Sequence, residues 1–319
     1  MKIAIAGAGA FGTALAIALS QRDAVTLWAR DAQAARQMQA SRQNPRLPDV
    51  KVPMQISISY DIDDVFAADA ILLALPAQAL SGFLTEHATG LAGKWLVACG
   101  KGIDLATLAG PTETIRRHVP TAISAILTGP SFAADIARGL PTALTLACRD
   151  DAVGKALQSA LSTQSLRLYR TVDTTGAELG GALKNIIAIA CGAAIGAGLG
   201  DSARAALMTR GFAEMQRLAD RLGADPDTLA GLSGLGDLVL TCSSAGSRNY
   251  RYGLSLGQKT SIDQSLTVEG IATAMAVTNM AQKLAIEMPI SAVVAALVSG
   301  EMTVPKAMTA LLSRPLKEE

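Results

Sequence analysis

The sequence is poor in the residue types that most often mark a metal centre or a disulfide scaffold. Its 319 residues include two histidines and four cysteines, and aromatic residues make up 3% of the chain. The cysteines, Cys99, Cys148, Cys191 and Cys242, are far apart and form no C-x-x-C pair. We therefore expect no metal site and no disulfide framework, and the reducing cytoplasm is the expected compartment.

The sequence also lacks an excess of positive or negative charge. The formal net charge is +1, and 17% of the residues are charged, without a long basic or acidic run. Nucleic-acid binding leaves a basic patch, and stacking on bases needs aromatic side chains, so nucleic acid is not an expected partner. The chain begins with a strand, so we expect no signal peptide. Its most apolar stretch, residues 185–200, is shorter than the roughly 20 residues of a membrane span, and we interpret it as a buried helix.

What the sequence does have is a glycine-rich turn near its start. Residues 2–6 are apolar enough for a short buried strand, residues 13–20 suit a helix, and Gly7, Gly9 and Gly12 between them form G-x-G-x-x-G. In a dinucleotide-binding turn the first glycine permits the turn and the second lets the backbone approach a pyrophosphate. The third lets the helix pack close to the strand. This order of strand, glycines and helix predicts a dinucleotide site, although a glycine turn that only packs is the alternative.

Two cations follow later strands of the same pattern. Arg30 ends the expected second strand, where an acidic residue would bind the ribose of NAD and an arginine suits the 2′-phosphate of NADP. This favours NADP(H) over NAD(H), which stays possible. Lys101 lies between two glycines just beyond the expected strand at residues 94–99, where ligands bind in open parallel sheets. A solvated arginine and a turn lysine are the alternatives.

The pattern of elements predicts an α/β chain in two parts. Expected strands alternate with helices up to residue 169, which indicates a mostly parallel sheet covered on both faces. These strands are residues 2–6, 24–29, 54–60, 70–75, 94–99, 124–127, 143–147 and 166–169, with a loop at 45–53. Long helices follow at 175–197, 203–222, 270–287, 290–299 and 304–313, and 238–240 is the one further strand we consider.

We therefore expect a Rossmann-type doubly wound sheet followed by an all-α domain. The division falls near Asp173: residues 1–173 form the dinucleotide-binding domain and residues 174–319 the helical substrate and catalytic domain. Apolar helices in the second domain are compatible with a homodimer.

Lys184 lies on an unusual face of the first long helix. At helical spacing it shares that face with Gly181, Gly180, Ala177 and Gly176, so another backbone or a small ligand can come close to it. Two adjacent glycines weaken a helix, which suggests a steric need. The alternative is tight helix packing with Lys184 reaching to water.

Two further polar stretches are candidates for a substrate site. Asp237 stands between a glycine-rich turn and an apolar run. Arg248 is flanked by Ser247 and Asn249, and an arginine with hydroxyl and amide neighbours can clamp a phosphate or carboxylate. Polar loops are common, so each stretch alone is weak evidence.

Together these residues resemble the bacterial NAD(P)-dependent glycerol-3-phosphate dehydrogenases over essentially the whole chain. Their order and spacing agree, which is more specific than any single motif. The matching segments are Gly7–Ala14, Gly100–Gly102, Thr128–Ala133, Leu183–Ile186, Thr209–Gly211, Gly234–Cys242, Ser247–Asn249 and Val268–Gly270.

The resemblance implies a role for each group of residues. Lys184 matches the catalytic lysine, which protonates the carbonyl oxygen of dihydroxyacetone phosphate as hydride arrives from the nicotinamide. The implied substrate positions are Lys101, Gly129, Ser131, Lys184, Asp237, Ser247, Arg248 and Asn249. The cofactor positions are Gly7, Gly9, Ala10, Phe11, Gly12, Arg30, Lys101, Ala133, Arg248, Thr267 and Glu269. Ala10 replaces a serine of many relatives, and Thr267 is less apolar than expected there.

The sequence thus predicts reduction of dihydroxyacetone phosphate to sn-glycerol 3-phosphate, the head-group precursor of phospholipids. Hydride comes from NAD(P)H, Lys184 supplies the proton and Arg248 neutralises the phosphate, so no metal is required. The nearest alternative is a 3-hydroxyacid or ketopantoate-type reductase, against which the Gly-Leu-Gly-Asp and Ser-Arg-Asn segments argue. The other alternative is a non-catalytic NADPH-binding sensor, which would need no proton donor.

Overall fold

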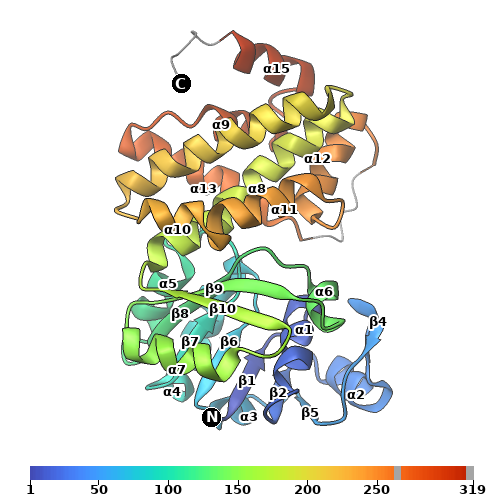
Figure 1. The fold of residues 1–319 in the computed structure, drawn as a ribbon, viewed down its shortest axis with the longest axis vertical. Coiled ribbons are helices and arrows are strands. Elements are labelled where there is room, and N and C mark those ends of the chain that lie inside the picture. The colour runs from blue at the N-terminus through green and yellow to red at the C-terminus, as the bar shows by residue number, and fades with distance from the viewer. Residues whose placement is uncertain (262–266, 314–319) are drawn as a thin grey trace. The chain divides into compact units, whose positions relative to one another are not determined.

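The computed structural model describes residues 1–261 and 267–313, which divide into two compact units. Unit 1 comprises Met1–Lys101 and Ala109–Glu178, and unit 2 comprises Gly102–Leu108 and the chain from Leu179 onward. Figure 1 labels most of their helices and strands. The sequence-based division into residues 1–173 and 174–319 stays a prediction.

Unit 1 is built on one eight-stranded sheet with the order β10-β9-β8-β7-β6-β1-β2-β5. All neighbours run parallel except β8 and β9, so the sheet is mostly parallel, as predicted. Its strands are β1 Ile3–Ala6, β2 Val25–Trp28, β5 Ile56–Ser59, β6 Ala70–Leu73, β7 Trp95–Ala98, β8 Ile123–Thr128, β9 Thr142–Cys148 and β10 Leu166–Thr171. The chain reverses its direction of winding at β1, which has β2 on one side and β6 on the other. Such a switch point is where doubly wound sheets bind ligands.

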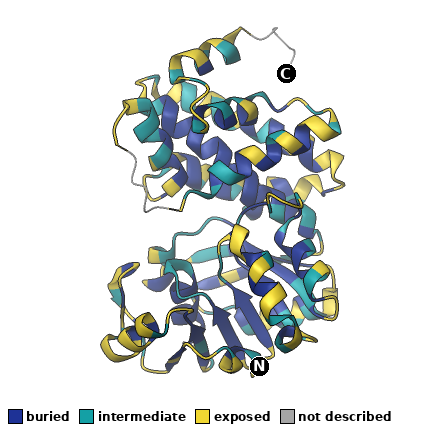
Figure 2. Cartoon of the chain, turned by 180° about the vertical axis from the view of Figure 1, so that it is seen from behind, coloured by how far each residue is buried: buried dark blue, intermediate teal, exposed yellow. Residues whose placement is uncertain are grey.

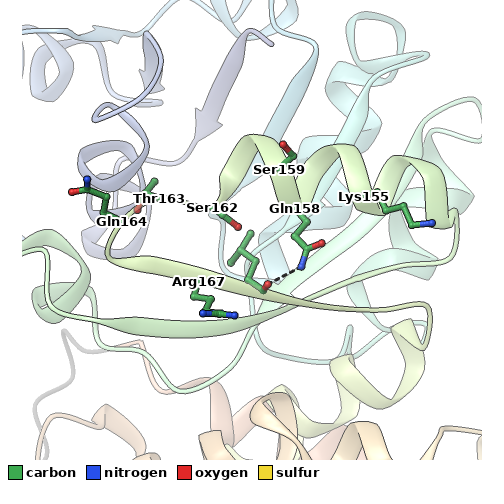
Figure 3. A pocket seen from close by; sticks show the side chains of 8 residues that line it. Lys155, Gln158, Ser159, Ser162, Thr163, Gln164 and Arg167 are labelled. Carbon is green, nitrogen blue, oxygen red and sulfur yellow. Dashed lines mark hydrogen bonds between the residues drawn. The ribbon is translucent and has the colours of Figure 1, made fainter.

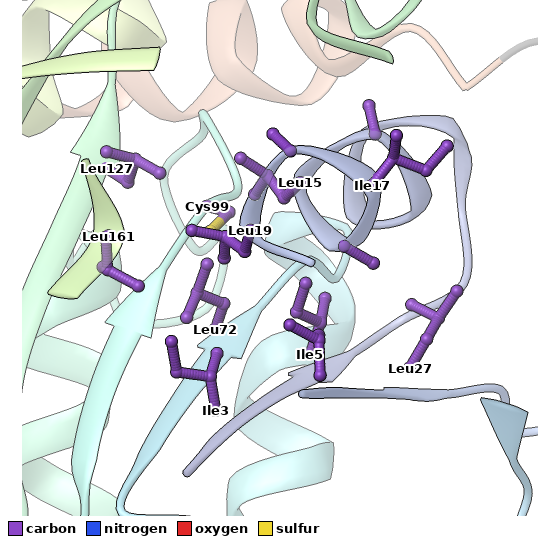
Figure 4. Packing of buried hydrophobic residues seen from close by; sticks show 14 of the residues in the cluster. Ile3, Ile5, Leu15, Ile17, Leu19, Leu27, Leu72, Cys99, Leu127 and Leu161 are labelled. Atoms are coloured by element: carbon purple, nitrogen blue, oxygen red, sulfur yellow. The ribbon is translucent and has the colours of Figure 1, made fainter. Parts of the chain in front are cut away.

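Alternate residues of each strand point to opposite faces of the sheet, and both faces are buried. Ile3 and Ile5 of β1 belong to one apolar cluster, whereas Ala4 and Ala6 belong to another. Figure 4 shows the first cluster, with Leu15 above the sheet. Most strand residues are accordingly buried in Figure 2, whereas Arg167 and Tyr169 of β10 are exposed.

Helices from both halves of unit 1 complete these clusters. The helices are α1 Ala10–Leu19, α2 Ala32–Ser41, α3 Asp63–Phe66, α4 Ala77–Leu91, α5 Pro111–His118, α6 Ala133–Ala137 and α7 Asp151–Leu161. Residues of α1, α2, α6 and α7 enter the cluster around Ile5, and residues of α3, α4 and α5 enter the cluster around Ala4. The predicted doubly wound α/β architecture is therefore confirmed.

One expectation for unit 1 was wrong. The stretch at 45–53, expected as a loop, contains most of an antiparallel hairpin of β3 Gln43–Asn44 and β4 Leu47–Lys51. Pro45 and Pro48 hid this hairpin, since prolines argue against a strand inside a sheet but are tolerated in an isolated two-stranded ribbon.

In the described residues of unit 2, the regular secondary structure consists of helices. Its helices are α8 Thr174–Gly196, which enters it at Leu179, α9 Gly200–Arg221, α10 Pro226–Ala230, α11 Asp237–Ser243, α12 Arg248–Gln258, α13 Glu269–Leu284, α14 Pro289–Val298 and α15 Val304–Leu312, with a π-helical turn at Leu232–Gly236. The all-α second part is therefore confirmed, but the strand considered at 238–240 is wrong, because these residues lie within α11.

Helix α8 is the central helix of unit 2. Its apolar residues pack with residues of α9, α11, α13 and α14 in one buried cluster. Within the described part of the chain it is the one helix long and apolar enough to cross a membrane, and 89% of its most apolar window is buried inside the protein. The apolar stretch at 185–200 is thus largely the core helix that the sequence indicates.

Glycines let α8 and α12 meet backbone to backbone. A Cβ added to Gly192 would lie 2.0 Å from Tyr250 O, and one on Gly196 would lie 2.3 Å from Leu254 O. From the other side, a Cβ on Gly253 would lie 2.1 Å from Ile189 O, and one on Gly257 would lie 2.3 Å from Ala193 O. Neither helix can carry a larger side chain at these points, so this glycine seam fixes α12 against α8.

Candidate active site

The glycine-rich turn lies at the carboxyl end of β1, at the switch point of the sheet. Gly7 has φ +118°, and a Cβ there would lie 2.4 Å from Ala74 O, just beyond β6. A Cβ on Gly12 would lie 2.0 Å from Gly7 O. The first and third glycines are therefore required by the turn and by the close packing of α1, as the motif predicts.

The second glycine faces open space. A Cβ on Gly9 would have one heavy atom of another described segment within 4 Å, Nη1 of Arg46 at 4.0 Å. Gly9 is the N-cap of α1 and supplies no side-chain cap, so the N–H groups of Ala10, Phe11 and Gly12 lack intrahelical partners. Ala10 and Phe11 are half-buried. Open backbone and unsatisfied donors at a helix N-terminus fit the pyrophosphate of a dinucleotide.

Arg30 lies two positions after Trp28, the last residue of β2, and is exposed. The next residue, Asp31, caps α2 by accepting a hydrogen bond from Ala34 N at 2.7 Å. This hydrogen bond fixes the backbone next to Arg30, whereas the side chain of Arg30 is exposed to solvent.

Lys101, Gly129 and Ser131 come together at the carboxyl ends of β7 and β8. Lys101 Nζ donates to Gly129 O at 2.8 Å, and Ser131 Oγ donates to the same oxygen at 3.2 Å. Gly129 has φ +134°, which a larger residue would not adopt readily. Parallel β7 and β8 end at one edge, and this explains why residues 28 positions apart meet.

Lys184 is buried in unit 2 beside a carboxylate and a hydroxyl. It is 6% exposed, and its Nζ donates to Asp237 Oδ1 at 2.5 Å and to Thr241 Oγ1 at 2.7 Å. The hydroxyl of Thr241 donates to Asp237 Oδ1 at 3.3 Å. Asp237 is 0% exposed, so the pair is a buried ion pair with further hydrogen bonds. The alternative of Lys184 reaching to water is thus excluded for this structure.

The glycine face of α8 has the steric role that its spacing suggests. A Cβ on Gly180 would lie 2.4 Å from Ser233 O, so α8 touches the backbone of the turn that precedes α11. A Cβ on Gly234 would lie 2.0 Å from Leu229 O, which holds this turn tightly folded. Asp237 is the first residue of α11, so the close approach brings its carboxylate to Lys184.

The Ser247-Arg248-Asn249 segment forms the start of α12. Ser247 caps the helix by accepting from Tyr250 N at 3.2 Å, whereas Arg248 is exposed. The amide of Asn249 donates to Asn185 Oδ1 at 2.8 Å, next to Lys184 in the chain. Arg248 is therefore next in the chain to Asn249, which is hydrogen-bonded to Asn185, the residue after Lys184. Ser247 and Asn249 also hold α12 in place through their hydrogen bonds.

Asn249 reaches a further predicted stretch as well. Its Oδ1 accepts from Gly270 N at 2.9 Å, and Gly270 follows Glu269, the first residue of α13. Glu269 is half-buried and Thr267 exposed. In unit 1, half-buried Ala133 starts α6, which packs against α1.

Sequence reasoning missed Thr241 as a site residue. It lies four positions after Asp237, and on a helix both residues face the same side. Reading 238–240 as a strand hid this signal. The neighbouring Cys242 is no competing acid–base group, because burial raises the pKa of its thiol well above the usual value.

Two surface hollows of unit 1, with volumes of about 470 and 480 Å³, lie elsewhere. Figure 3 shows the first, with side chains from α7, the following loop and β10 around it. The Gln158 amide donates to Leu168 O at 2.9 Å across its floor. None of the predicted site residues lines either hollow.

Comparisons with known proteins cover the chain almost from end to end. Residues 2–154 match the NAD-dependent glycerol-3-phosphate dehydrogenase N-terminus family, and residues 173–309 match the corresponding C-terminus family. The glycerol-3-phosphate dehydrogenase [NAD(P)+] of Paracoccus denitrificans is 60% identical over 319 residues, with 100% of both chains covered. That of Cereibacter sphaeroides is 61% identical over 317 residues, covering 99% of this chain and 100% of the relative.

Solved structures agree with this assignment. The crystal structure of glycerol-3-phosphate dehydrogenase from Coxiella burnetii has a TM-score of 0.93 at 36% identity, covering 98% of this chain and 99% of that one. A ketopantoate reductase from Ralstonia eutropha has a TM-score of 0.63 at 18% identity, covering 97% of this chain and 100% of that one, a likeness of fold alone. The chain therefore belongs to the family of NAD-dependent glycerol-3-phosphate dehydrogenases.

Proposed function

We propose that this chain reduces dihydroxyacetone phosphate to sn-glycerol 3-phosphate with NAD(P)H, and that Lys184 moves the proton. The observation that carries the proposal is the buried set of Lys184, Asp237 and Thr241 in a member of this family. A buried ion pair costs desolvation energy, and an apolar pair of similar volume would often be as stable. Retaining a buried lysine therefore supports a chemical role.

The proton transfer follows from the partners of Lys184. Bound NAD(P)H supplies a hydride to the carbonyl carbon. The Lys184 ammonium donates a proton to the carbonyl oxygen as negative charge develops there. In the reverse direction neutral Lys184 accepts the hydroxyl proton. Asp237 and Thr241 hold the Nζ atom in one position, which favours a fixed geometry for the transfer.

Cationic and polar groups suit the phosphate of the substrate. Arg248 presents its exposed guanidinium at the N-terminus of α12, where the helix dipole also favours an anion. Ser247 and Asn249 are proposed as its neighbours in the pocket. On unit 1, Lys101, Gly129 and Ser131 are proposed as further substrate contacts.

The cofactor is proposed to bind at the glycine-rich turn of unit 1. Gly7, Gly9, Ala10, Phe11 and Gly12 would hold its pyrophosphate, as their open backbone and unsatisfied donors fit. The remaining proposed cofactor contacts are Arg30, Lys101, Ala133, Arg248, Thr267 and Glu269. The exposed Arg30 supports a preference for NADP(H) over NAD(H), since an arginine suits a 2′-phosphate.

Substrate choice tests the proposal. Oxidation of NADPH and NADH is followed with dihydroxyacetone phosphate and with ketoacids that lack a phosphate. Faster turnover of a ketoacid would favour a ketopantoate-type reductase, and tight NADPH binding without turnover of any ketone would favour a sensor. We expect Lys184→Ala to keep NADPH affinity and to lower kcat roughly 10²-fold or more.

We also propose that the protein is located in the cytoplasm and forms a homodimer. Light scattering measures the oligomeric state.

A further inference from the structure

The hairpin of β3 and β4 is fixed to the glycine-rich turn by one buried side chain. Asn44 is 2% exposed, and its Nδ2 donates to Ala8 O at 3.1 Å and to Thr13 Oγ1 at 2.6 Å. Its Oδ1 accepts from Arg46 N at 3.0 Å. The amide of Asn44 thus ties the turn of the hairpin to both ends of the G-x-G-x-x-G segment.

This anchoring places a guanidinium over the open glycine. Arg46 follows Pro45 in the two-residue turn between β3 and β4, and its residue is exposed. Among the residues that the structure describes, its Nη1 is the one heavy atom of another segment within 4 Å of a Cβ built on Gly9, at 4.0 Å. The guanidinium of Arg46 therefore lies beside Gly9, where the absence of a side chain leaves the backbone accessible to a ligand.

The electrostatic surroundings of Arg46 favour binding of an anion. The first turn of α1 carries no acidic residue and no side-chain cap, so the positive end of the helix is uncompensated. In the described part of the chain, the Arg46 guanidinium has neither a hydrogen bond nor an ion pair with a carboxylate. A guanidinium beside a helix N-terminus is repelled by it, and a phosphate between them removes that repulsion.

We propose that Arg46 is a further cofactor-binding residue that contacts the pyrophosphate. This inference rests on the proposed dinucleotide site but adds a residue that the G-x-G-x-x-G motif does not contain. Because NADH and NADPH share the pyrophosphate, Arg46 serves both cofactors alike. Arg30, in contrast, distinguishes them through the 2′-phosphate.

Cofactor dissociation constants of four variants test this inference without any turnover. We expect Arg46→Ala to raise the Kd of NADH and NADPH by the same factor, about 10-fold or more, because a charge-assisted hydrogen bond to phosphate is lost. Arg46→Lys restores part of the affinity as a point charge. Arg30→Ala weakens NADPH alone. Lys51→Ala, which removes an exposed charge from the same hairpin, leaves both constants unchanged.

Salt dependence gives a second readout. An exposed phosphate contact is screened, so the Kd of the wild type rises with salt, and this rise is smaller in Arg46→Ala. Unchanged dissociation constants in Arg46→Ala would overturn the inference. A loss confined to NADPH would overturn it too, since it would assign Arg46 to the 2′-phosphate, and an equal loss in Lys51→Ala would reveal general charge attraction only.

Failure of this inference is separable from failure of the proposed function. If the wild type reduces dihydroxyacetone phosphate but Arg46→Ala binds both cofactors normally, the role of Arg46 alone is wrong. If Arg46→Ala loses affinity for both cofactors while the wild type reduces no dihydroxyacetone phosphate, the role of Arg46 stands and the proposed reaction is wrong. Thermal unfolding of each variant shows that the exposed substitutions leave the fold intact.

Discussion

Replacing Lys184 by methionine separates its effect on stability from its effect on catalysis. Methionine has a similar length but no charge, so Lys184→Met leaves the carboxylate of Asp237 buried without its ammonium. The two side chains are 7% and 1% exposed, and their atoms Nζ and Oδ1 are 2.5 Å apart. Water therefore cannot compensate for the lost partner.

The size of the effect follows from this burial. Removing one partner of a buried ion pair costs about 3–5 kcal/mol of unfolding free energy. A domain is stabilised by only about 5–15 kcal/mol, so unit 2 of Lys184→Met should be markedly less stable. The double variant Lys184→Met, Asp237→Asn removes both charges and should recover most of the loss. Turnover should stay low in both variants, because neither has a proton donor at position 184.

The assay must report on unit 2. Both tryptophans, Trp28 and Trp95, lie in unit 1, so tryptophan fluorescence does not follow the affected helices. Hydrogen exchange of the α8 and α11 amides, together with circular dichroism in urea, measures the change directly. If Lys184→Met were as stable as the wild type, the buried Asp237 carboxylate would not need the Lys184 ammonium, and this prediction would be refuted. Recovery of turnover in the double variant would refute the proton transfer.

Further predictions concern the neighbourhood of this helix. Glu178 is buried with its Oε1 accepting from Thr112 N, and burial raises its pKa from 4.5 to about 7. Between these two pKa values the folded state keeps a proton that the unfolded state has released. The contribution of Glu178 to stability is therefore fully present below pH 4.5 and falls by roughly 3 kcal/mol as the pH rises to about 7. Glu178→Gln should abolish this slope in thermal unfolding measured across pH, and an unchanged slope would contradict its assignment to the buried Glu178 carboxyl. Gly180→Ala should cost about 1–3 kcal/mol and lower kcat, because its Cβ would press on the following turn. Its control is Gly82→Ala on α4, where a Cβ meets nothing within 4 Å and helix propensity should make the change neutral or stabilising. Arg248→Ala should raise the KM for dihydroxyacetone phosphate while leaving that for a ketone without phosphate nearly unchanged, and equal effects on both substrates would refute a phosphate clamp.

The sheet and the long helices could be predicted because their periodicity is strong. Apolar runs such as the one at Ala70–Leu73 fit strands buried on both faces, and Gly7 and Gly12 of the first turn have a steric explanation. The face of Lys184 could also be predicted, since helical spacing alone places Gly180 beside it. What spacing could not predict was the occupant of that face, the turn at Ser233, because that contact joins segments about 50 residues apart.

Short elements were harder for a physical reason. Three apolar residues at 238–240 have no period, so a strand and a helix fit them equally well. The structure resolves this through tertiary contacts: only a helix brings both Asp237 and Thr241 to one lysine. The hairpin at 43–51 is held by the side chain of Asn44, a long-range contact that a local pattern cannot reveal.

The glycine seam between α8 and α12 limits how this protein can exchange parts with its relatives. A chimera that grafts a foreign α12 must also bring glycine to positions 253 and 257, since a single methyl group there would meet the α8 backbone at about 2.1–2.3 Å. A graft without these glycines would stand away from α8. It would carry Arg248, the first residue of α12, with it. The two helices therefore have to be exchanged together, and Arg248 at the start of α12 moves with them.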